Sequence, residues 1–308
     1  MEPEMGIADQ ITTLKAALGG GVSPAMATPL IPGSHTVRIE GVPGIVDFLI
    51  GKGVKGLFVG GTTGEGTQLD DDQRRILHEA AASAAAGRIP VLLHVGAQRT
   101  EAAVELARHA AGLRPAAIVA MTPTFYGMSD TALARYFTAI AAAAPEIPLF
   151  LYDIPQFAVN GISPTLLATL ARDIPSLAGL KSSRVDIQIV RQLIDALPLE
   201  KILLAGNESA ALGSLALGAD GLISGLSTAI PEPFVAMTRA FAAGNIEEAR
   251  EWQRTINRLL GVLTGVRVGG IKAILNQRGI EVGPPVPTLD AVDDLLWPRA
   301  AGILGVAA

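Results

Sequence analysis

The 308-residue chain contains no cysteine, which excludes disulfides, thiolate metal sites and a cysteine nucleophile. Only 4% of its residues are aromatic although 49% are hydrophobic, so the apolar character comes from alanine and aliphatic side chains, as in helices packed closely on a sheet. The 24 Lys and Arg against 29 Asp and Glu give a mild net charge of −5 with no basic stripe, which argues against nucleic-acid binding.

Long apolar runs are also missing. No stretch reaches the roughly 18 uninterrupted apolar residues of a membrane span, and the N-terminus MEPEMGIADQ lacks the basic and then apolar pattern of a secretory signal. We therefore expect a soluble, cytoplasmic protein. The four histidines show no metal-ligand spacing, and no phosphate-loop or dinucleotide glycine motif appears. A metal site and a bound nucleotide therefore have no support.

Eight short apolar runs recur along the chain. Each has about the length of a strand and is rich in Val, Ile and Leu. The runs cover residues 22–27, 56–59, 91–95, 117–121, 149–152, 177–181, 202–205 and 221–224. Continuous rather than alternating apolarity favours parallel strands that are buried on both faces.

Helices are predicted between these runs, because acids or good N-cap residues open several of the intervening segments. Those helices cover residues 70–87, 100–112, 129–143, 163–172, 186–197 and 207–217. A βα unit repeated eight times predicts a (β/α)8 TIM barrel. Outside the repeat we predict helices at residues 10–18, 245–264, 269–277 and 288–296. The resulting division is an N-terminal helical segment (1–20), the barrel (21–243) and a C-terminal helical extension (244–308).

Functional residues of such a barrel gather at the carboxyl ends of the strands. Of the six lysines, Lys181 is the one that closes an apolar run on that face. Burial disfavours the ammonium ion and lowers its pKa, which frees the amine to attack a carbonyl and form a Schiff base. The pattern fits equally well a lysine that extends from a strand end into solvent.

Hydroxyl groups follow two other strands. Tyr152 closes the fifth run, where packing is the commoner role, but beside an amine nucleophile a tyrosine can shuttle protons. Thr62 and Thr63 lie in a glycine-flanked turn whose N–H groups and hydroxyls suit a carboxylate or phosphate, although an ordinary strand–helix loop explains them too. We interpret Glu65 as an acid at a helix N-terminus rather than a base. For His94, at the end of the third run, packing is the favoured role.

Several segments together resemble the dihydrodipicolinate synthase and N-acetylneuraminate lyase superfamily. They run along nearly the whole chain, in order and with compatible spacing. They are GGTTGEGTQL (60–69), LYDIP (151–155), AGLKSS (178–183), ATP (27–29), LGADGLISG (217–225) and RGIEVGPPVP (278–287). The resemblance implies a (β/α)8 barrel with a C-terminal helical extension, and a class I aldolase or lyase for pyruvate-like 2-oxo acids. It also implies a homotetramer of two dimers that needs neither a metal nor an organic cofactor.

The same resemblance implies roles for the candidate residues. Lys181 forms the Schiff base and Tyr152 relays protons. Thr62 links to that tyrosine through hydroxyl groups, and Thr63 with its loop amides holds the carboxylate of the 2-oxo acid. Further candidate substrate-binding residues lie at or near strand ends, namely Thr28, Gly61, Ser183, Asn207, Ser224 and Phe157.

Two positions depart from the synthase that makes lysine precursors. Its arginine for the carboxylate of the second substrate aligns with Phe157, and no arginine lies between Tyr152 and Arg172. A phenyl ring cannot bind a carboxylate in two-pronged fashion as guanidinium does. Its interface tyrosine aligns with Phe125, so the usual relay is interrupted unless Tyr126 replaces it.

We therefore predict a carbon–carbon lyase that cleaves a 2-keto-3-deoxy sugar acid or a 4-hydroxy-2-oxo acid. Its partners would be small-molecule 2-oxo acids and aldehydes, with no nucleic acid and no membrane. Three alternatives stay open at this stage. They are a dihydrodipicolinate synthase with an altered acceptor site, a dehydratase using the same imine, and a non-catalytic 2-oxo acid binder.

Overall fold

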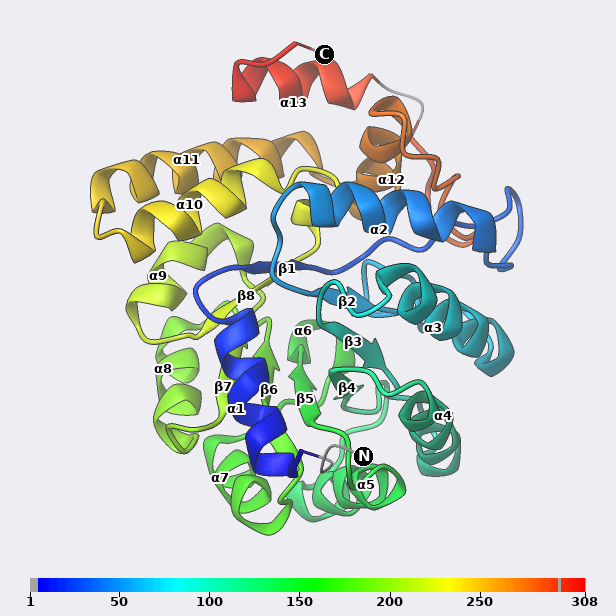
Figure 1. Ribbon diagram of the computed structural model, residues 1–308, viewed down its shortest axis with the longest axis vertical. Helices are drawn as coiled ribbons and strands as arrows, with labels where there is room; N and C mark the ends of the chain where they lie inside the picture. The colour runs from blue at the N-terminus through cyan, green and yellow to red at the C-terminus, as the bar shows by residue number, and fades with distance from the viewer. Residues whose placement is uncertain (1–4, 293–294, 308) are drawn as a thin grey trace.

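The computed structural model describes residues 5–292 and 295–307, in which eight strands alternate with helices (Figure 1). The strands are β1 (Val22–Pro24), β2 (Leu57–Val59), β3 (Val91–His94), β4 (Ala117–Met121), β5 (Leu149–Asp153), β6 (Leu177–Ser182), β7 (Ile202–Ala205) and β8 (Gly221–Ser224). The helices up to β8 are α1 (Ile7–Leu18), α2 (Val42–Gly51), α3 (Asp71–Ala85), α4 (Thr100–Gly112), α5 (Asp130–Ala143), α6 (Pro155–Ala158), α7 (Pro164–Asp173), α8 (Ile187–Ala196) and α9 (Ala211–Ala216). After β8 come α10 (Glu232–Ala242), α11 (Ile246–Val262), α12 (Arg267–Gln277) and α13 (Leu296–Leu304).

The strands form one parallel sheet that closes on itself. Neighbours follow the order β1-β8-β7-β6-β5-β4-β3-β2. The remaining gap is bridged between Ala25 and Phe58, and the Met26 N–H donates to the Phe58 carbonyl at 2.9 Å. The predicted TIM barrel is confirmed, and β1, which we expected to reach residue 27, ends as a strand at Pro24.

Two apolar clusters explain why the strands are apolar on both faces. One cluster includes strand residues such as Phe58, Val119 and Phe150 together with Leu14 and Leu18 of α1. Because successive strand side chains point to opposite faces, this cluster fills the barrel and α1 closes its N-terminal end. The other cluster is mainly aliphatic and lies between the strands and the surrounding helices.

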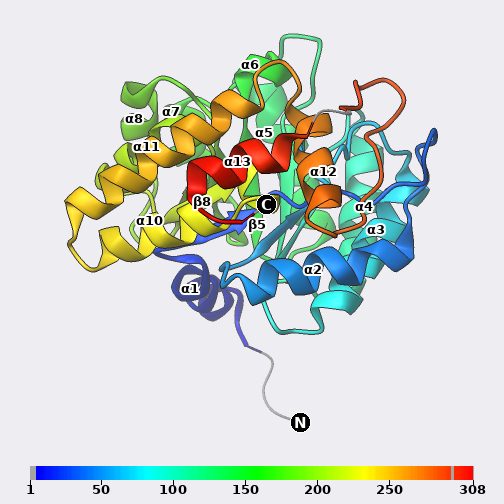
Figure 2. The ribbon, with the colours of Figure 1, turned by 90° about the horizontal axis from the view of Figure 1, so that it is seen from above.

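The C-terminal helices stack beside the barrel, with α10 against α11, and α13 against both α11 and α12 (Figures 1 and 2). The predicted helix at 288–296 is wrong. Residues 288–292 are not helical, residues 293–294 lie outside the described part, and the helix begins at Leu296. A Cβ on Gly269 of α12 would lie 2.1 Å from the Asp290 carbonyl. The backbone of residues 288–292 therefore packs against α12 instead of forming a helix. No bounds were predicted for helices α2, α6 and α10, and the predicted helix at 288–296 meets α13 only at Leu296.

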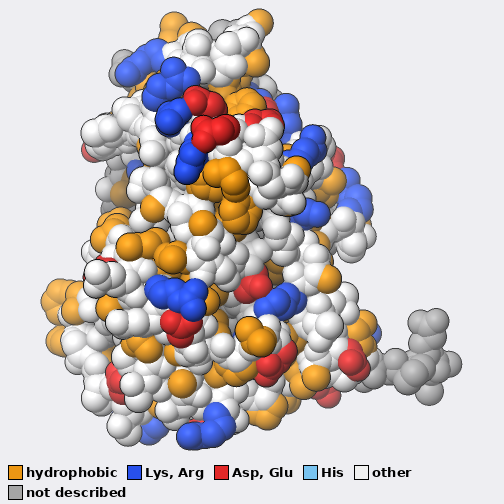
Figure 3. Space-filling view, turned by 90° about the vertical axis from the view of Figure 1, so that its left-hand side faces the viewer, with side chains coloured by type: hydrophobic (Ala, Val, Ile, Leu, Met, Phe, Trp, Pro, Cys, Tyr) orange, Lys and Arg blue, Asp and Glu red, His pale blue; other side chains and the backbone are white. Residues whose placement is uncertain are grey.

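In the part of the chain that the structure describes, each helix by itself is too short or too polar to span a bilayer. Within that part, α11 and α12 taken together meet the test of length and composition, but they are bent by 104° at the break between them. On the face seen in Figure 3, acidic and basic side chains lie interspersed among apolar ones. The division into residues 1–20, 21–243 and 244–308 stays a prediction.

Candidate active site

Lys181 and Tyr152 lie side by side at the carboxyl ends of β6 and β5. They are register partners in the sheet, so their side chains point the same way. Both are buried, with 4% and 2% of their surfaces exposed. The Lys181 Nζ lies 3.7 Å from the centre of the Tyr152 ring and 4.2 Å from the centre of the Phe58 ring. Lys181 is therefore not a lysine that extends into solvent.

The surroundings of Lys181 favour a neutral amine. Burial lowers the pKa of its ammonium well below the usual value, and the negative charge of Glu208 offsets part of that shift. Among the described residues, the lysines that form ion pairs are Lys15, Lys52 and Lys272. With no acid paired to it in that part of the chain, the Lys181 amine is available as a nucleophile.

Tyr152 is held by a hydroxyl contact and stays protonated. Its Oη lies 3.0 Å from Thr62 Oγ1, the arrangement that the resemblance implies. Burial raises its pKa to about 12, although hydrogen bonds with Thr62 and Ser183 oppose that shift. The phenol is thus a proton donor at neutral pH, placed against the amine of Lys181.

The turn that carries Thr62 and Thr63 is held by close backbone packing. A Cβ on Gly66 would lie 1.8 Å from the Gly60 carbonyl, so a side chain there would break the turn. Thr28, buried, donates from Oγ1 to the Gly64 carbonyl at 2.6 Å. Thr28 therefore helps to hold the turn in place through this hydrogen bond.

Glu65 is not an acid at a helix N-terminus, as we had interpreted it. Its backbone is left-handed, with φ of 57°, and its buried carboxylate accepts a hydrogen bond from Lys272 Nζ at 2.7 Å. The Val286 N–H donates to the same carboxylate at 2.6 Å. These two hydrogen bonds connect the turn to α12 and to the segment after α12, about two hundred residues later in the sequence.

A cavity of about 390 Å³ opens beside these groups. The predicted site residues that line it are Thr62, Thr63, Tyr152, Phe157, Lys181, Ser183 and Asn207. Ligand pockets are typically of this size and mix apolar walls with a few convergent polar groups. Among the described residues, no group of three or more acidic or histidine side chains is arranged to hold a metal ion.

The other predicted site residues do not line this cavity. Gly61 lies within the turn, and Ser224 uses its hydroxyl to donate to Glu208 at 2.8 Å. Phe125 and Tyr126 lie on the loop after β4, 77% and 76% exposed, with their rings edge to face at 5.0 Å. Phe125 has a left-handed backbone, with φ of 77°.

Sequence reasoning missed several residues that line the cavity, among them Glu208, Gln156 and Arg267. Glu208 directly follows the predicted site residue Asn207 after β7, so its position was a usable signal. Gln156 donates to the Ser183 carbonyl at 2.8 Å and supports the loop after β6. Arg267 begins α12 in the C-terminal extension, where the sequence pattern carries no sign of a site.

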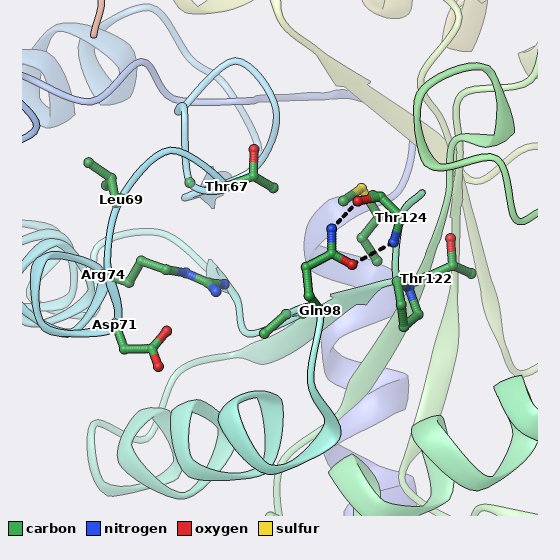
Figure 4. Close-up of a pocket in the computed structure, with 12 residues that line it drawn as sticks. Thr67, Leu69, Asp71, Arg74, Gln98, Thr122 and Thr124 are labelled. Atoms are coloured by element: carbon green, nitrogen blue, oxygen red, sulfur yellow. Dashed lines mark hydrogen bonds between the residues drawn. The ribbon is translucent and has the colours of Figure 1, made fainter. Parts of the chain in front are cut away.

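A second, smaller cavity of about 180 Å³ lies at the carboxyl ends of β3 and β4 (Figure 4), and it shares no lining residue with the first. Gln98 accepts from the Thr124 N–H at 2.9 Å and donates to the Thr124 hydroxyl. The Arg74 guanidinium donates to the His94 carbonyl at 2.7 Å. His94 is buried, and its ring packs edge-on against the ring of Tyr152, which agrees with the packing role favoured for it.

Comparison with known proteins agrees with this geometry. Residues 19–294 match the model of the dihydrodipicolinate synthetase family. An N-acetylneuraminate lyase from Mediterraneibacter gnavus is 33% identical over 272 residues, 86% of each chain. A 4-hydroxy-tetrahydrodipicolinate synthase from Exiguobacterium is 34% identical over 86% of this chain and 90% of that protein. The structure of a wild-type sialic acid aldolase from Ruminococcus gnavus superposes with a TM-score of 0.89, at 31% identity, over 94% of this chain and 97% of that one.

Proposed function

We propose that this chain, which belongs to the dihydrodipicolinate synthetase family and is an enzyme of the class I aldolase and lyase type, forms a Schiff base between Lys181 and a pyruvate-type 2-oxo acid. The observation that carries the proposal is the buried amine of Lys181, 3.7 Å from the Tyr152 ring centre. Burial lowers the pKa of Lys181, which favours the neutral amine whose lone pair can attack a carbonyl.

The first steps use groups that are already in contact. The amine adds to the C2 carbonyl of the 2-oxo acid, forming a carbon–nitrogen bond. The Tyr152 phenol supplies the proton with which the former carbonyl oxygen leaves as water, and Thr62, 3.0 Å away, exchanges protons with it. Loss of a proton from C3 of the resulting cationic imine, to the Tyr152 phenolate, gives an enamine.

The enamine then attacks an aldehyde, and in the reverse direction the same groups release it. The new C–C bond forms as the aldehyde oxygen takes up a proton, and water hydrolyses the imine to return Lys181. We assign the carboxylate of the 2-oxo acid to Thr63, because its hydroxyl and turn lie in the same cavity. Orientation by that carboxylate places C2 beside the amine.

The substrate we favour is a 2-keto-3-deoxy sugar acid or a 4-hydroxy-2-oxo acid. Phe157 lines the cavity with 68% of its surface exposed, in the place where the synthase carries its carboxylate-binding arginine. An apolar ring there favours an aldehyde end with fewer negative charges. The assembly we propose is a homotetramer in the cytoplasm, with exposed Phe125 and Tyr126 at a subunit contact. Molar mass by light scattering tests it.

The test of the Schiff base is borohydride reduction in the presence of pyruvate. We expect a covalent adduct of the mass of reduced pyruvate at Lys181, located by peptide mass spectrometry, and none in Lys181→Ala. Lys201→Ala is a matched control, since Lys201 precedes β7 at the opposite end of the barrel. Absence of the adduct in the wild-type protein would refute the proposal.

Retro-aldol screening then separates the reactions. We expect pyruvate release from 2-keto-3-deoxy acids that requires Lys181. Product formation from pyruvate and aspartate semialdehyde, in place of that release, would favour the synthase. Loss of water without cleavage would favour the dehydratase, and pyruvate binding with no turnover would favour a binder.

A further inference from the structure

Arg184 forms a buried ion pair that the proposed reaction leaves without a role. It follows β6, and its Nε donates to Asp153 Oδ2 at 2.6 Å. The Asp153 carboxylate is fully buried, and 19% of the Arg184 side chain is exposed. Asp153 comes directly after Tyr152 in β5, so the two side chains point to opposite faces of the sheet. The ion pair therefore lies behind the proposed catalytic groups rather than among them.

The ion pair fastens the segment that follows β5, residues 154–162, which we call the β5 loop. Asp153 Oδ1 accepts from the Ile162 N–H at 2.9 Å, and Arg184 Nη2 donates to the Ile162 carbonyl at 3.2 Å. A Cβ on Gly161 would lie 2.3 Å from Arg184 Nη2, so the guanidinium occupies the space that a side chain there would need. The two ends of the β5 loop are thus joined through one guanidinium and one carboxylate.

The β5 loop needs to be held because part of its backbone is strained. Val159 has φ of 68°, a positive value that β-branched residues rarely adopt. Such a conformation persists only where the surrounding structure imposes it. The amide of Asn160 holds the middle of the loop, since it donates to the Pro123 and Tyr126 carbonyls at 2.7 and 2.8 Å. The buried ion pair holds the loop at its base.

Two apolar side chains at the opening of the active-site cavity depend on this arrangement. Phe157 belongs to the β5 loop, and Val185 directly follows Arg184. Both line the cavity, and 68% and 77% of their surfaces are exposed. We call these two side chains the apolar mouth. Exposed apolar groups that border a ligand cavity suit contact with a bound molecule, so the position of the β5 loop decides what the mouth can contact.

We propose that Arg184, paired with Asp153, is a positioning residue that holds the apolar mouth in the place where it contacts the aldehyde half of the substrate. This inference rests on the proposed aldolase function and deepens it. The steps between Lys181 and the 2-oxo acid do not need Arg184. Its loss therefore weakens the use of the aldehyde and leaves imine formation with pyruvate intact.

The test uses Arg184→Met, which removes the charge and the donors. With pyruvate saturating, we expect the KM for D-glyceraldehyde to rise roughly tenfold and kcat to change less than about threefold, because a displaced loop holds the aldehyde less well. The pyruvate concentration that half-saturates borohydride trapping should change less than about twofold. Arg184→Lys, which can still pair with Asp153, should recover part of the loss. Arg172→Met, at an exposed arginine paired with Asp173, is the matched control.

Two further measurements separate positioning from a general loss of stability. In hydrogen exchange followed by mass spectrometry, peptides that cover the β5 loop should exchange faster in Arg184→Met, while peptides from α7 should not change. In a Phe157→Ala background, Arg184→Met should raise the KM for D-glyceraldehyde by less than about twofold, because the main contact that Arg184 positions is already gone.

Three outcomes would overturn the inference. They are an equal rise in the half-saturating pyruvate concentration and in the KM for D-glyceraldehyde, unchanged exchange in the β5 loop, and additive effects of Phe157→Ala and Arg184→Met. Loss of trapping in the wild-type protein would instead overturn the proposed function, and the exchange measurement, which needs no substrate, would still decide whether Arg184 holds the loop. If Arg184→Met does not fold because Asp153 is left buried and unpaired, the double variant Asp153→Asn/Arg184→Met leaves no buried charge and carries the same comparison.

Discussion

The buried ion pair between Glu65 and Lys272 predicts a large and non-additive loss of stability when one partner is removed. Both side chains have 0% of their surface exposed. Lys272 donates to Glu65 at 2.7 Å and to the Pro284 carbonyl at 2.8 Å. The perturbation we choose is Lys272→Met, which keeps the apolar volume of the side chain and removes its charge.

The expected magnitude follows from what each variant leaves behind. Lys272→Met leaves the Glu65 carboxylate buried with the Val286 N–H as its remaining donor, and we expect a loss of about 3–5 kcal/mol. Glu65→Gln leaves the cost of the left-handed backbone unchanged. We expect it to lower the stability by about 1–3 kcal/mol, less than Lys272→Met, because burial already lowers the pKa of Lys272 and the amine can lose its proton. The double variant should be less destabilised than the sum by about 2–3 kcal/mol.

Urea unfolding of the four proteins at pH 7, followed by circular dichroism, measures this cycle. The same proteins should also need more pyruvate for half-maximal trapping, because Glu65 holds the turn that carries Thr62 and Thr63. Lys52→Met is a suitable control, since Lys52 pairs with Glu232 where the two side chains are 36% and 33% exposed. The reasoning is refuted if Lys272→Met costs less than about 1 kcal/mol, or if the single losses add.

Three further predictions concern the site and the barrel. Tyr152→Phe should lower kcat by about 10²–10⁴-fold with little change in the KM for pyruvate, measured by steady-state kinetics; unchanged kcat would exclude the proton relay. Lys181→Met should raise Tm at pH 7, with the gain shrinking toward pH 10. Burial lowers the folded-state pKa of Lys181, so the unfolded chain binds more protons and wild-type stability rises with pH. A gain independent of pH would contradict this. Gly179→Ala, whose Cβ would lie 1.9 Å from the Ile202 carbonyl, should abolish folding, whereas Gly213→Ala in α9, with open space, should be tolerated in expression and melting assays.

The strands and the two central site residues were accessible from the sequence because their signals are local. A strand buried on both faces must be apolar at every position, so β4, β7 and β8 have the predicted bounds. A lysine that closes such a run is conspicuous for the same reason, and Lys181 is indeed buried there. Its role and that of Tyr152 stay predictions until the trapping experiment is done.

The C-terminal region was less accessible because its signals are not local. Residues 288–292 run against α12 as a non-helical segment, held by an approach of the Asp290 carbonyl to Gly269 that no helical period reveals. The α10 and α13 helices went unpredicted. In the same region, Arg267 enters the cavity from outside the βα repeat, so the rule that strand ends carry function could not find it.

The barrel and the pairing of Tyr152 with Lys181 could be inferred from the sequence, since alternating buried strands and helices admit few topologies and adjacent strands bring their ends together. The surroundings of that pair depend on how distant segments pack. This packing turned Glu65 from an apparent helix-terminal acid into the buried partner of Lys272, and it brought Arg267 to Glu208. Strands and helices can be predicted because their patterns reflect burial, and the hydrophobicity of each residue indicates whether it is buried. The partner of a buried charge is fixed only when distant segments pack together.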